Sequence, residues 1–307
     1  MITRGIWLQA LILCLCSGCG AVSQKVSSFM GGEDNATPPT EPTDIEQRLD
    51  IHKLWDTDIG DGADTQYLKL VPVYVDGRIF VANSEGNVEA LDATSGASLW
   101  NTELDDTRIT GGPGVGENLV LVGTGKAEVI TLAADTGKIL WRGSVSSEVL
   151  SAPQPAGKTI VVRTIDGKIF GLDSQDGKRL WTYEQSVPAL TLRGTSSPVI
   201  AGNFLIAGFD EGRLAAIELQ TGKVAWEKNF EQPVCLSAAD RTLLILTDSG
   251  KLHIAEASPK SYHEMASAQV FEISNMKIQC WTPPVLCGGR IYIHELSGRL
   301  ICVDVRR

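Results

Sequence analysis

With 307 residues, the chain is long enough to form one large all-β domain or two ordinary domains. Its composition, 43% hydrophobic and 21% charged, is that of an ordinary globular protein, which excludes intrinsic disorder and a protein with many membrane spans. A net charge of −10 without any run of Lys and Arg argues against nucleic acid as a partner.

The first residues have the features of an export signal. A short basic start precedes an apolar run from Ile6 to Leu15, and small residues follow up to Cys19. This run is shorter than the roughly 20 residues that a transmembrane helix needs. The residues before Cys19 are similar to the lipobox of bacterial lipoproteins, with Cys16 where Leu is usual. An ordinary signal peptide that ends near Gly20 is the alternative.

The lipobox resemblance implies that residues 1–18 are a signal peptide and that Cys19 carries lipid, including palmitate, as the first mature residue. Gly20 stands where an Asp would retain a lipoprotein at the inner membrane, so the resemblance implies a lipid anchor on the periplasmic side of the outer membrane. Residues 19–50 are rich in Ser, Gly, Pro, Thr and acidic residues and lack an apolar period. This composition predicts a flexible tether.

One pattern recurs from Leu54 onward. Each copy opens with a Gly, passes through a turn such as Thr-Gly or Asp-Gly, and closes with a Trp. The opening Gly and the closing Trp are 23 to 25 positions apart in four copies: Gly77 to Trp100, Gly116 to Trp141, Gly157 to Trp181 and Gly202 to Trp226. Short apolar runs between the turns indicate hairpins in series. A period of about 41 residues with four short strands is typical of a propeller blade.

Two weaker copies follow. The fifth lacks the closing Trp, and the sixth stops after the strand at residues 298–304, so it lacks an outer strand. Residues 52–55 match the closing strand at residues 138–141, but no blade precedes them. We therefore predict an all-β fold over residues 51–307: a β-propeller of about six four-stranded antiparallel blades, in which the N-terminal strand closes the last blade.

Most residues that could take part in catalysis or ligand binding have a structural interpretation. The repeated Trp side chains are expected to pack between blades. Four carboxylates are expected to accept backbone N–H bonds in turns: Asp92, Asp135, Asp173 and Glu218. The four His residues are too scattered for a metal site or a catalytic triad: His52, His253, His263 and His294. The sequence therefore predicts no catalytic residue, no metal site and no cofactor.

Four cysteines remain beyond the signal and the lipid position: Cys235, Cys280, Cys287 and Cys302. They form no CxxC pair and have no His partner at metal spacing, so zinc is not predicted. One interpretation is a disulfide among the last three, which an oxidising compartment would permit. The favoured one is that they are small buried residues in strands.

The repeat resembles a known family. Its sequence from Glu89 through Gly96 to Trp100 is similar to a repeat that two groups of proteins share. One group is the quinoprotein dehydrogenases, which use pyrroloquinoline quinone (PQQ), and the other is the BamB family of outer-membrane assembly factors. The dehydrogenases carry an adjacent Cys-Cys pair, which the mature part of this sequence lacks. The segment at residues 188–198, PALTLRGTSSP, and the lipobox resemble the BamB family.

The BamB resemblance implies a non-catalytic periplasmic scaffold without a cofactor. It implies that the chain binds the BamA barrel-assembly protein as a monomer within a complex and assists the insertion of outer-membrane β-barrels. It places Leu190, Leu192 and Arg193 in the partner-binding loop. The alternative for the whole protein is a PQQ-dependent dehydrogenase or another ligand-binding propeller.

The spacing of the repeat marks the same segment. The closing Trp and the next opening Gly are 16 positions apart after Trp100 and Trp141 but 21 apart after Trp181. A longer inter-blade loop with two Leu and one Arg is typical of a binding hot spot, although it could also be the buried start of an inner strand. The sequence departs from the family in two ways: the family has eight blades, and its acidic segment is absent after Phe230. From about Pro233 the sequence resembles quinoprotein-like propellers of other kinds.

Overall fold

The structure is a computed structural model, and it describes residues 52–60, 68–185, 197–209, 211–239, 241–271, 283–294 and 299–306. The chain divides into two units, Met1–His52 and Lys53–Arg307, and every described strand belongs to the second unit. The described residues form strands and turns, and they contain no helix long and apolar enough to cross a membrane.

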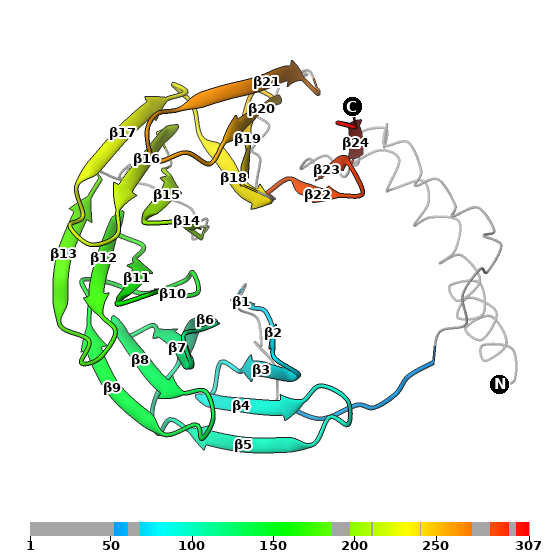
Figure 1. The fold of residues 1–307 in the computed structure, drawn as a ribbon. Coiled ribbons are helices and arrows are strands. Elements are labelled where there is room, and N and C mark those ends of the chain that lie inside the picture. Colours follow the sequence, from blue (N-terminus) through cyan, green and yellow to red (C-terminus); the bar gives the residue numbers. More distant parts are fainter. Residues whose placement is uncertain are drawn as a thin grey trace, which may run out of the picture. The chain divides into compact units, whose positions relative to one another are not determined.

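Six sheets follow one another along the chain, each made of consecutive strands that we call a blade (Figure 1). Blade 1 contains β2 (Val73–Val75), β3 (Arg78–Ala82), β4 (Asn87–Asp92) and β5 (Ser98–Glu103). Blade 2 contains β6 (Ile109–Gly116), β7 (Leu119–Thr124), β8 (Glu128–Ala133) and β9 (Ile139–Ser144), with β1 (Lys69–Leu70) parallel to β6. Blade 3 contains β10 (Gln154–Ala156), β11 (Thr159–Arg163), β12 (Lys168–Asp173) and β13 (Arg179–Glu184).

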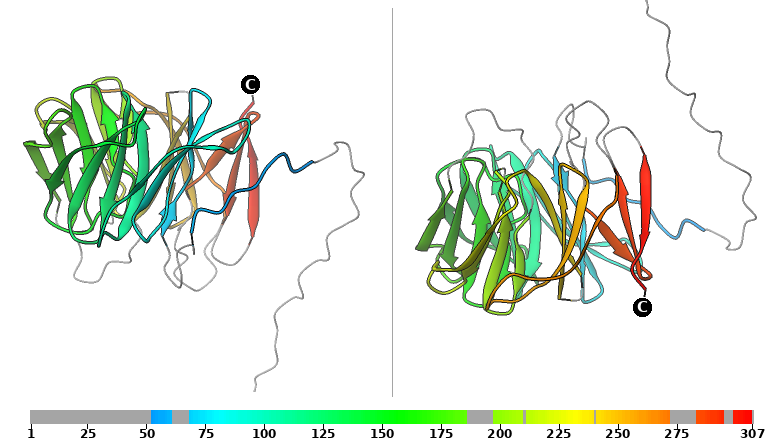
Figure 2. Two further views of the ribbon diagram at one scale, coloured as in Figure 1. Left: turned by 90° about the horizontal axis from the view of Figure 1, so that it is seen from below. Right: turned by 90° about the horizontal axis from the view of Figure 1, so that it is seen from above.

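The remaining three sheets continue this order. Blade 4 contains β14 (Val199–Ala201), β15 (Phe204–Gly208), β16 (Arg213–Glu218) and β17 (Val224–Asn229). Blade 5 contains β18 (Val234–Ala239), β19 (Thr242–Thr247), β20 (Lys251–Glu256) and β21 (His263–Gln269). Blade 6 contains β22 (Val285–Cys287), β23 (Arg290–His294) and β24 (Leu300–Asp304). The side views in Figure 2 show the strands crossing between two faces, where the turns and connections lie. The predicted propeller architecture and its blade count are confirmed.

The hydrophobic core lies between successive blades, at interfaces that we call seams. Five clusters of buried residues fill the five seams from blade 1–2 to blade 5–6. The middle strands are covered by a neighbouring blade on each side, so β12 buries Ile169, Phe170, Gly171 and Leu172 in succession. Burial on both faces explains why the apolar runs of the sequence do not alternate.

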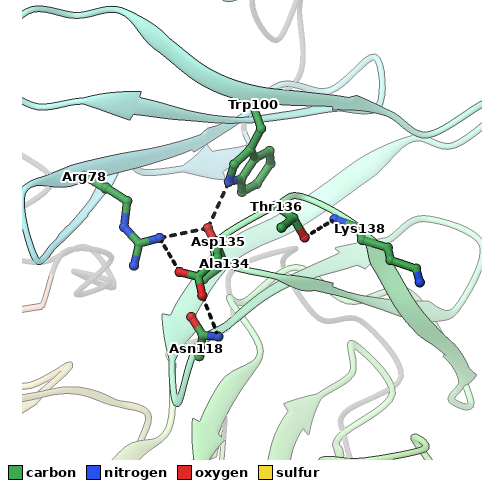
Figure 3. A network of polar contacts seen from close by, with 7 residues as sticks. All are labelled: Arg78, Trp100, Asn118, Ala134, Asp135, Thr136 and Lys138. Carbon is green, nitrogen blue, oxygen red and sulfur yellow. Dashed lines mark hydrogen bonds and ion pairs between the residues drawn. The ribbon is translucent and has the colours of Figure 1, made fainter.

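Each closing Trp joins its blade to the next one. The indole nitrogen of Trp100 donates to the Ala134 carbonyl at 2.9 Å, and the ring lies against Gly137, where a Cβ would be 2.5 Å from it (Figure 3). The other three indoles make the corresponding bonds, Trp141 to Ser174 at 3.0 Å, Trp181 to Leu219 at 2.7 Å and Trp226 to Ser258 at 2.9 Å. The predicted packing of the Trp side chains between blades is confirmed.

A β-bulge interrupts the pairing of the last two strands in each of blades 1–5. Trp100 pairs with Ala90 and Ser98 pairs with Leu91, so Leu99 has no partner in the register. The bulged residue points outward, and four large side chains in this position are about half exposed: Leu99 at 52%, Leu140 at 49%, Leu180 at 47% and Met265 at 49%.

Residues 52–60 are described but belong to no strand, and the sheet of blade 6 has three strands in the described part of the chain. Trp55 nevertheless makes the contact of a closing Trp. Its indole nitrogen donates to the Ala93 carbonyl at 3.3 Å, and its ring lies against Gly96 of blade 1. The pairing of this segment with β24 stays a prediction.

The favoured interpretation of the cysteines as buried residues was wrong for two of them. Cys287 and Cys302 are exposed free thiols, and Cys235 is half-buried. Blade 6 packs on blade 5 through Ile301 and Val303, which alternate with Cys302 along β24, so the thiol lies on the opposite face. Cys280 lies outside the described residues.

Candidate functional site

The predicted site residues Leu190, Leu192, Arg193 and Cys19 lie outside the described residues. The structure does show the two strands that the predicted loop connects. Strand β13 ends at Glu184 and β14 begins at Val199, whereas β17 ends at Asn229 and β18 already begins at Val234. The longer connection between blades 3 and 4 is therefore confirmed, and the seam beneath it is the candidate site.

Three large side chains meet at this seam. Arg163 ends β11, Tyr183 lies near the end of β13, and Phe209 follows β15 of the next blade. The Arg163 guanidinium lies 5.1 Å from the centre of the Phe209 ring, and the Tyr183 ring lies 5.6 Å from it at 45°. Arg163 and Phe209 are buried, 5% and 3% exposed, so these cation–π and aromatic contacts are shielded from solvent.

A series of polar contacts leads from the stack of Arg163, Tyr183 and Phe209 to the surface. The Tyr183 hydroxyl donates to Glu227 Oε1 at 3.0 Å, and Arg213 Nη1 lies 3.5 Å from Glu227 Oε2. Burial, together with the hydrogen bond to Glu227, raises the pKa of Tyr183 to about 12, so the hydroxyl keeps its proton and remains a donor. Arg213 and Glu227 are each more than a third exposed and are accessible to a partner.

Blade 3 carries a second group of charges at the same end. Lys168 Nζ lies 3.6 Å from Asp166 and 3.7 Å from Glu184. Burial raises the pKa of Asp166, but hydrogen bonds from Thr164 and Ser146 and the charge of Lys168 outweigh it, so the pKa lies below its ordinary value. This end of the seam therefore presents fixed charges of both signs, which suit a protein partner with charges of its own.

Side chains that bind metal ions do not gather in the described part of the chain. No group of three or more His, Cys, Asp or Glu side chains there could hold a metal ion. Asp92 and Asp173 accept backbone N–H groups of their turns, at 2.8 Å from Ser95 and 2.8 Å from Gln175, as predicted. Glu218 bonds instead to the Thr221 hydroxyl.

Asp135 differs from the turn role predicted for it. It accepts hydrogen bonds from Arg78 of blade 1 at 2.8 Å and from Asn118 at 3.1 Å (Figure 3). The same Arg78 donates to the Ala134 carbonyl at 3.1 Å, beside the Trp100 bond. The guanidinium holds the pKa of Asp135 below its usual value, so the carboxylate joins two blades.

Sequence reasoning missed the stack of Arg163, Tyr183 and Phe209. A signal was available, because Phe209 occupies a turn position at which blades 1, 2, 3 and 5 carry Asn or Thr. The contact itself could not be inferred, since it joins residues of two blades whose relative register only the structure gives.

Comparisons with known proteins agree with the fold and identify relatives. The sequence profile of the family described as "Outer membrane protein assembly factor BamB" matches residues 84–307. The likeness therefore extends well past Phe230. A protein of that name from Nitrosomonas eutropha is 33% identical over 271 residues, which cover 86% of this chain and 64% of the relative. The chain thus spans just under two thirds of the length of that relative.

Solved structures show the same fold at lower identity. The crystal structure of BamB from Moraxella catarrhalis matches 76% of this chain and 69% of its own, with a TM-score of 0.64 and 21% identity. A quinohemoprotein alcohol dehydrogenase from Comamonas testosteroni matches 74% of this chain and 51% of its own, with a TM-score of 0.54 and 16% identity.

Proposed function

Because the chain belongs to the BamB family of outer membrane protein assembly factors, we propose that it is a non-catalytic scaffold that binds a BamA-type barrel-assembly protein. The observation that carries this proposal is the family match over residues 84–307, which includes blades 2–6 and the last two strands of blade 1. The scaffold would assist the assembly and insertion of outer-membrane β-barrels as a monomer within a complex.

The partner-binding loop is the connection between β13 and β14. In this proposal Leu190 and Leu192 bury apolar surface in a groove of the partner, and Arg193 makes a charge-assisted contact with a carboxylate or with backbone carbonyls. The exposed Arg213–Glu227 pair at the same seam supports this location, because a polar rim around apolar anchors is the usual anatomy of a protein interface.

The proposed cellular location rests on the N-terminal residues. Cys19 would carry the lipid anchor on the periplasmic side of the outer membrane, and residues 19–50 would tether the propeller to it. The described propeller residues begin close to that tether, with Trp55 in contact with blade 1.

The test is binding of the purified mature protein to the periplasmic domains of a BamA-type protein. Leu192→Ala and Arg193→Ala should each weaken binding by about thirty-fold, since truncating a hot-spot residue costs ~2 kcal/mol. Leu140→Ala and Arg142→Ala on β9 are matched controls, because both side chains are exposed and lie on blade 2. Equal effects in the two pairs, or no binding by the intact protein, would contradict the proposal.

The likeness to the quinohemoprotein dehydrogenase concerns the fold alone and does not favour catalysis. The relatives that match most of the chain are named as assembly factors. A dehydrogenase is the alternative function, and an assay for quinone-dependent oxidation tests it.

A further inference from the structure

The repeat makes the seams comparable position by position, and one turn position stands out. This position directly follows the second strand in blades 1, 3 and 4, and it is the last residue of the second strand in blades 2 and 5. Blades 1, 2, 3 and 5 carry a polar residue there: Asn83, Thr124, Thr164 and Thr247. The side-chain oxygen of Thr124 accepts the backbone N–H groups of Lys126 at 3.2 Å and Glu128 at 3.1 Å. Blade 4 carries Phe209, which cannot accept such a bond.

Two positions of the preceding blade face this turn residue, and both are also unusual at the same seam. Arg163 corresponds to residues that are small or aliphatic in blades 1, 2, 4 and 5, namely Ala82, Gly123, Gly208 and Leu246, and to His294 in blade 6. Tyr183 corresponds to residues without an aromatic ring: Thr102, Gly143, Lys228 and Ala268. Three departures from the repeat therefore coincide at the blade 3–4 seam, where Arg163 and Tyr183 both contact Phe209.

The departures have a local cost that the fold does not require. Replacing Thr by Phe removes a side-chain acceptor from a tight turn, and burying an Arg costs desolvation energy. The turn of blade 4 keeps its backbone bonds, from Phe209 to Arg213 at 2.8 Å and from Gly212 to Phe209 at 2.9 Å. Residues that break a local rule in this way are typical of functional sites.

The three unusual residues lie at the seam where the long connection between β13 and β14 begins, and this position suggests what they do. Tyr183 lies two residues before Gln185, which is 8% exposed and is the last described residue before the connection. Contacts with Phe209 and Glu227 hold the Tyr183 side chain on the next blade at both its ring and its hydroxyl. The shorter connection after β17 has Lys228 at the position of Tyr183.

We propose that Arg163, Tyr183 and Phe209 are positioning residues that hold the end of β13, from which the chain continues into the partner-binding loop, against blade 4. This inference rests on the proposed function, in which that loop binds the barrel-assembly protein. The three side chains act through the loop and do not touch the partner themselves. Their effect is therefore on affinity, through the conformational freedom that the loop loses on binding.

The test replaces the stack with residues that the same fold already accommodates. The double variant Tyr183→Thr, Phe209→Thr gives the blade 3–4 seam the pair that blade 1–2 has in Thr102 and Thr124. Val122→Ala, in the buried core of blade 2, is the control for a general loss of stability. Tyr183→Phe keeps the ring and removes the hydroxyl, which contacts Glu227 at 3.0 Å and Gln185 at 3.4 Å.

Two measurements are made on each purified mature protein: affinity for the periplasmic domains of a BamA-type protein, and the rate of tryptic cleavage after Arg193. We expect the double variant to bind at least tenfold more weakly and to be cleaved at least fivefold faster. Tyr183→Phe should lie between the double variant and the wild type, and Val122→Ala should match the wild type in both measurements.

The outcomes separate this inference from the proposed function. Unchanged affinity in the double variant, or an equal loss in Val122→Ala, would overturn the positioning role. If the wild-type protein binds no barrel-assembly protein, the proposed function fails, and the cleavage rates alone decide the inference. Equal rates in the double variant and the wild type would then refute it, and a faster rate confined to the stack variants would support it.

Discussion

Trp55 donates its indole N–H to the carbonyl of Ala93 at 3.3 Å, in the way that Trp100 donates to Ala134 at 2.9 Å one blade further on. Trp55 belongs to no strand, yet it occupies the place on blade 1 that a closing strand of a preceding blade would use.

We expect Trp55→Ala to lower the free energy of unfolding by about 2 kcal/mol, less than the roughly 3–5 kcal/mol of a fully buried Trp, because the ring is partly exposed. Urea denaturation measures the change. Leu54→Ala is the control, since the Leu54 side chain is 86% exposed and should cost less than 0.5 kcal/mol.

Truncation tests the same segment in another way. A protein that lacks residues 1–60 should unfold or aggregate, whereas one that lacks residues 1–45 should keep the stability of the full chain, because only the first loses the Trp55 contact. Equal melting temperatures of the two proteins would contradict the role of this segment in closing blade 6.

Gly137→Ala should destabilise the protein by more than Gly157→Ala does. Both glycines have positive φ angles, +68° and +63°, so alanine at either position costs about 1 kcal/mol of backbone strain. A Cβ on Gly137 would lie 2.5 Å from the Trp100 ring, whereas a Cβ on Gly157 would have no atom within 4 Å. The difference in unfolding free energy measures the close packing of Gly137 against Trp100 and Thr102, and equal losses would show that this packing contributes nothing.

Glu264 predicts a pH dependence at the blade 4–5 seam. Its Oε2 accepts the Tyr262 hydroxyl at 2.8 Å and lies 2.8 Å from His253 Nδ1. Burial raises the pKa of Glu264, but these hydrogen bonds outweigh it and lower the pKa to about 2, from an ordinary 4.5. Because the folded pKa is depressed, the stabilisation is present above pH 4.5 and is lost as the pH falls toward 2.

Glu264→Gln should therefore destabilise the protein at pH 7 and have a much smaller effect at pH 3. Melting temperatures at the two pH values measure it. Glu231→Gln is a control, because Glu231 is exposed. A difference between Glu264→Gln and wild type that is the same at both pH values would show that the carboxylate charge is not the cause.

Addition of PQQ and Ca²⁺ should neither raise the melting temperature nor give dye-linked oxidation of alcohols or sugars. A ligand present at 100 times its dissociation constant would stabilise the folded state by about 2.7 kcal/mol, so binding would be visible as a thermal shift. Turnover or a shift would favour the dehydrogenase alternative over the scaffold.

Mass spectrometry of the mature N-terminus should find a lipidated Cys19. Cys19→Ser should abolish the modification and release the protein from the membrane fraction. A free, unmodified terminus at Gly20 or Ala21 in the native protein would exclude the anchor.

The sequence alone was sufficient to predict the blades and the packing of their Trp side chains, because both depend on spacing within one repeat. The contacts of Asp135, the exposure of Cys302 and the stack around Phe209 depend on which residues of two neighbouring sheets face each other. Asp135 could not be assigned to Arg78 from its own turn, since the two residues are 57 positions apart. The predicted pairing of residues 52–55 with β24 would likewise join distant segments, and it stays a prediction.

The contact between Trp and Gly has a consequence for how such a chain can change its length. Blades 1–4 each supply a Trp for the seam ahead and a Gly for the seam behind, where Trp55 takes the place of a preceding blade's Trp at Gly96. If one full period is inserted or removed, a Trp again meets a Gly, and the new seam resembles the old ones. If half a period is inserted or removed, the two sides of the new seam no longer bring a Trp against a Gly, and the contact is lost. Evolution by whole-repeat duplication and deletion can therefore vary the number of blades among relatives while every remaining junction keeps its partner.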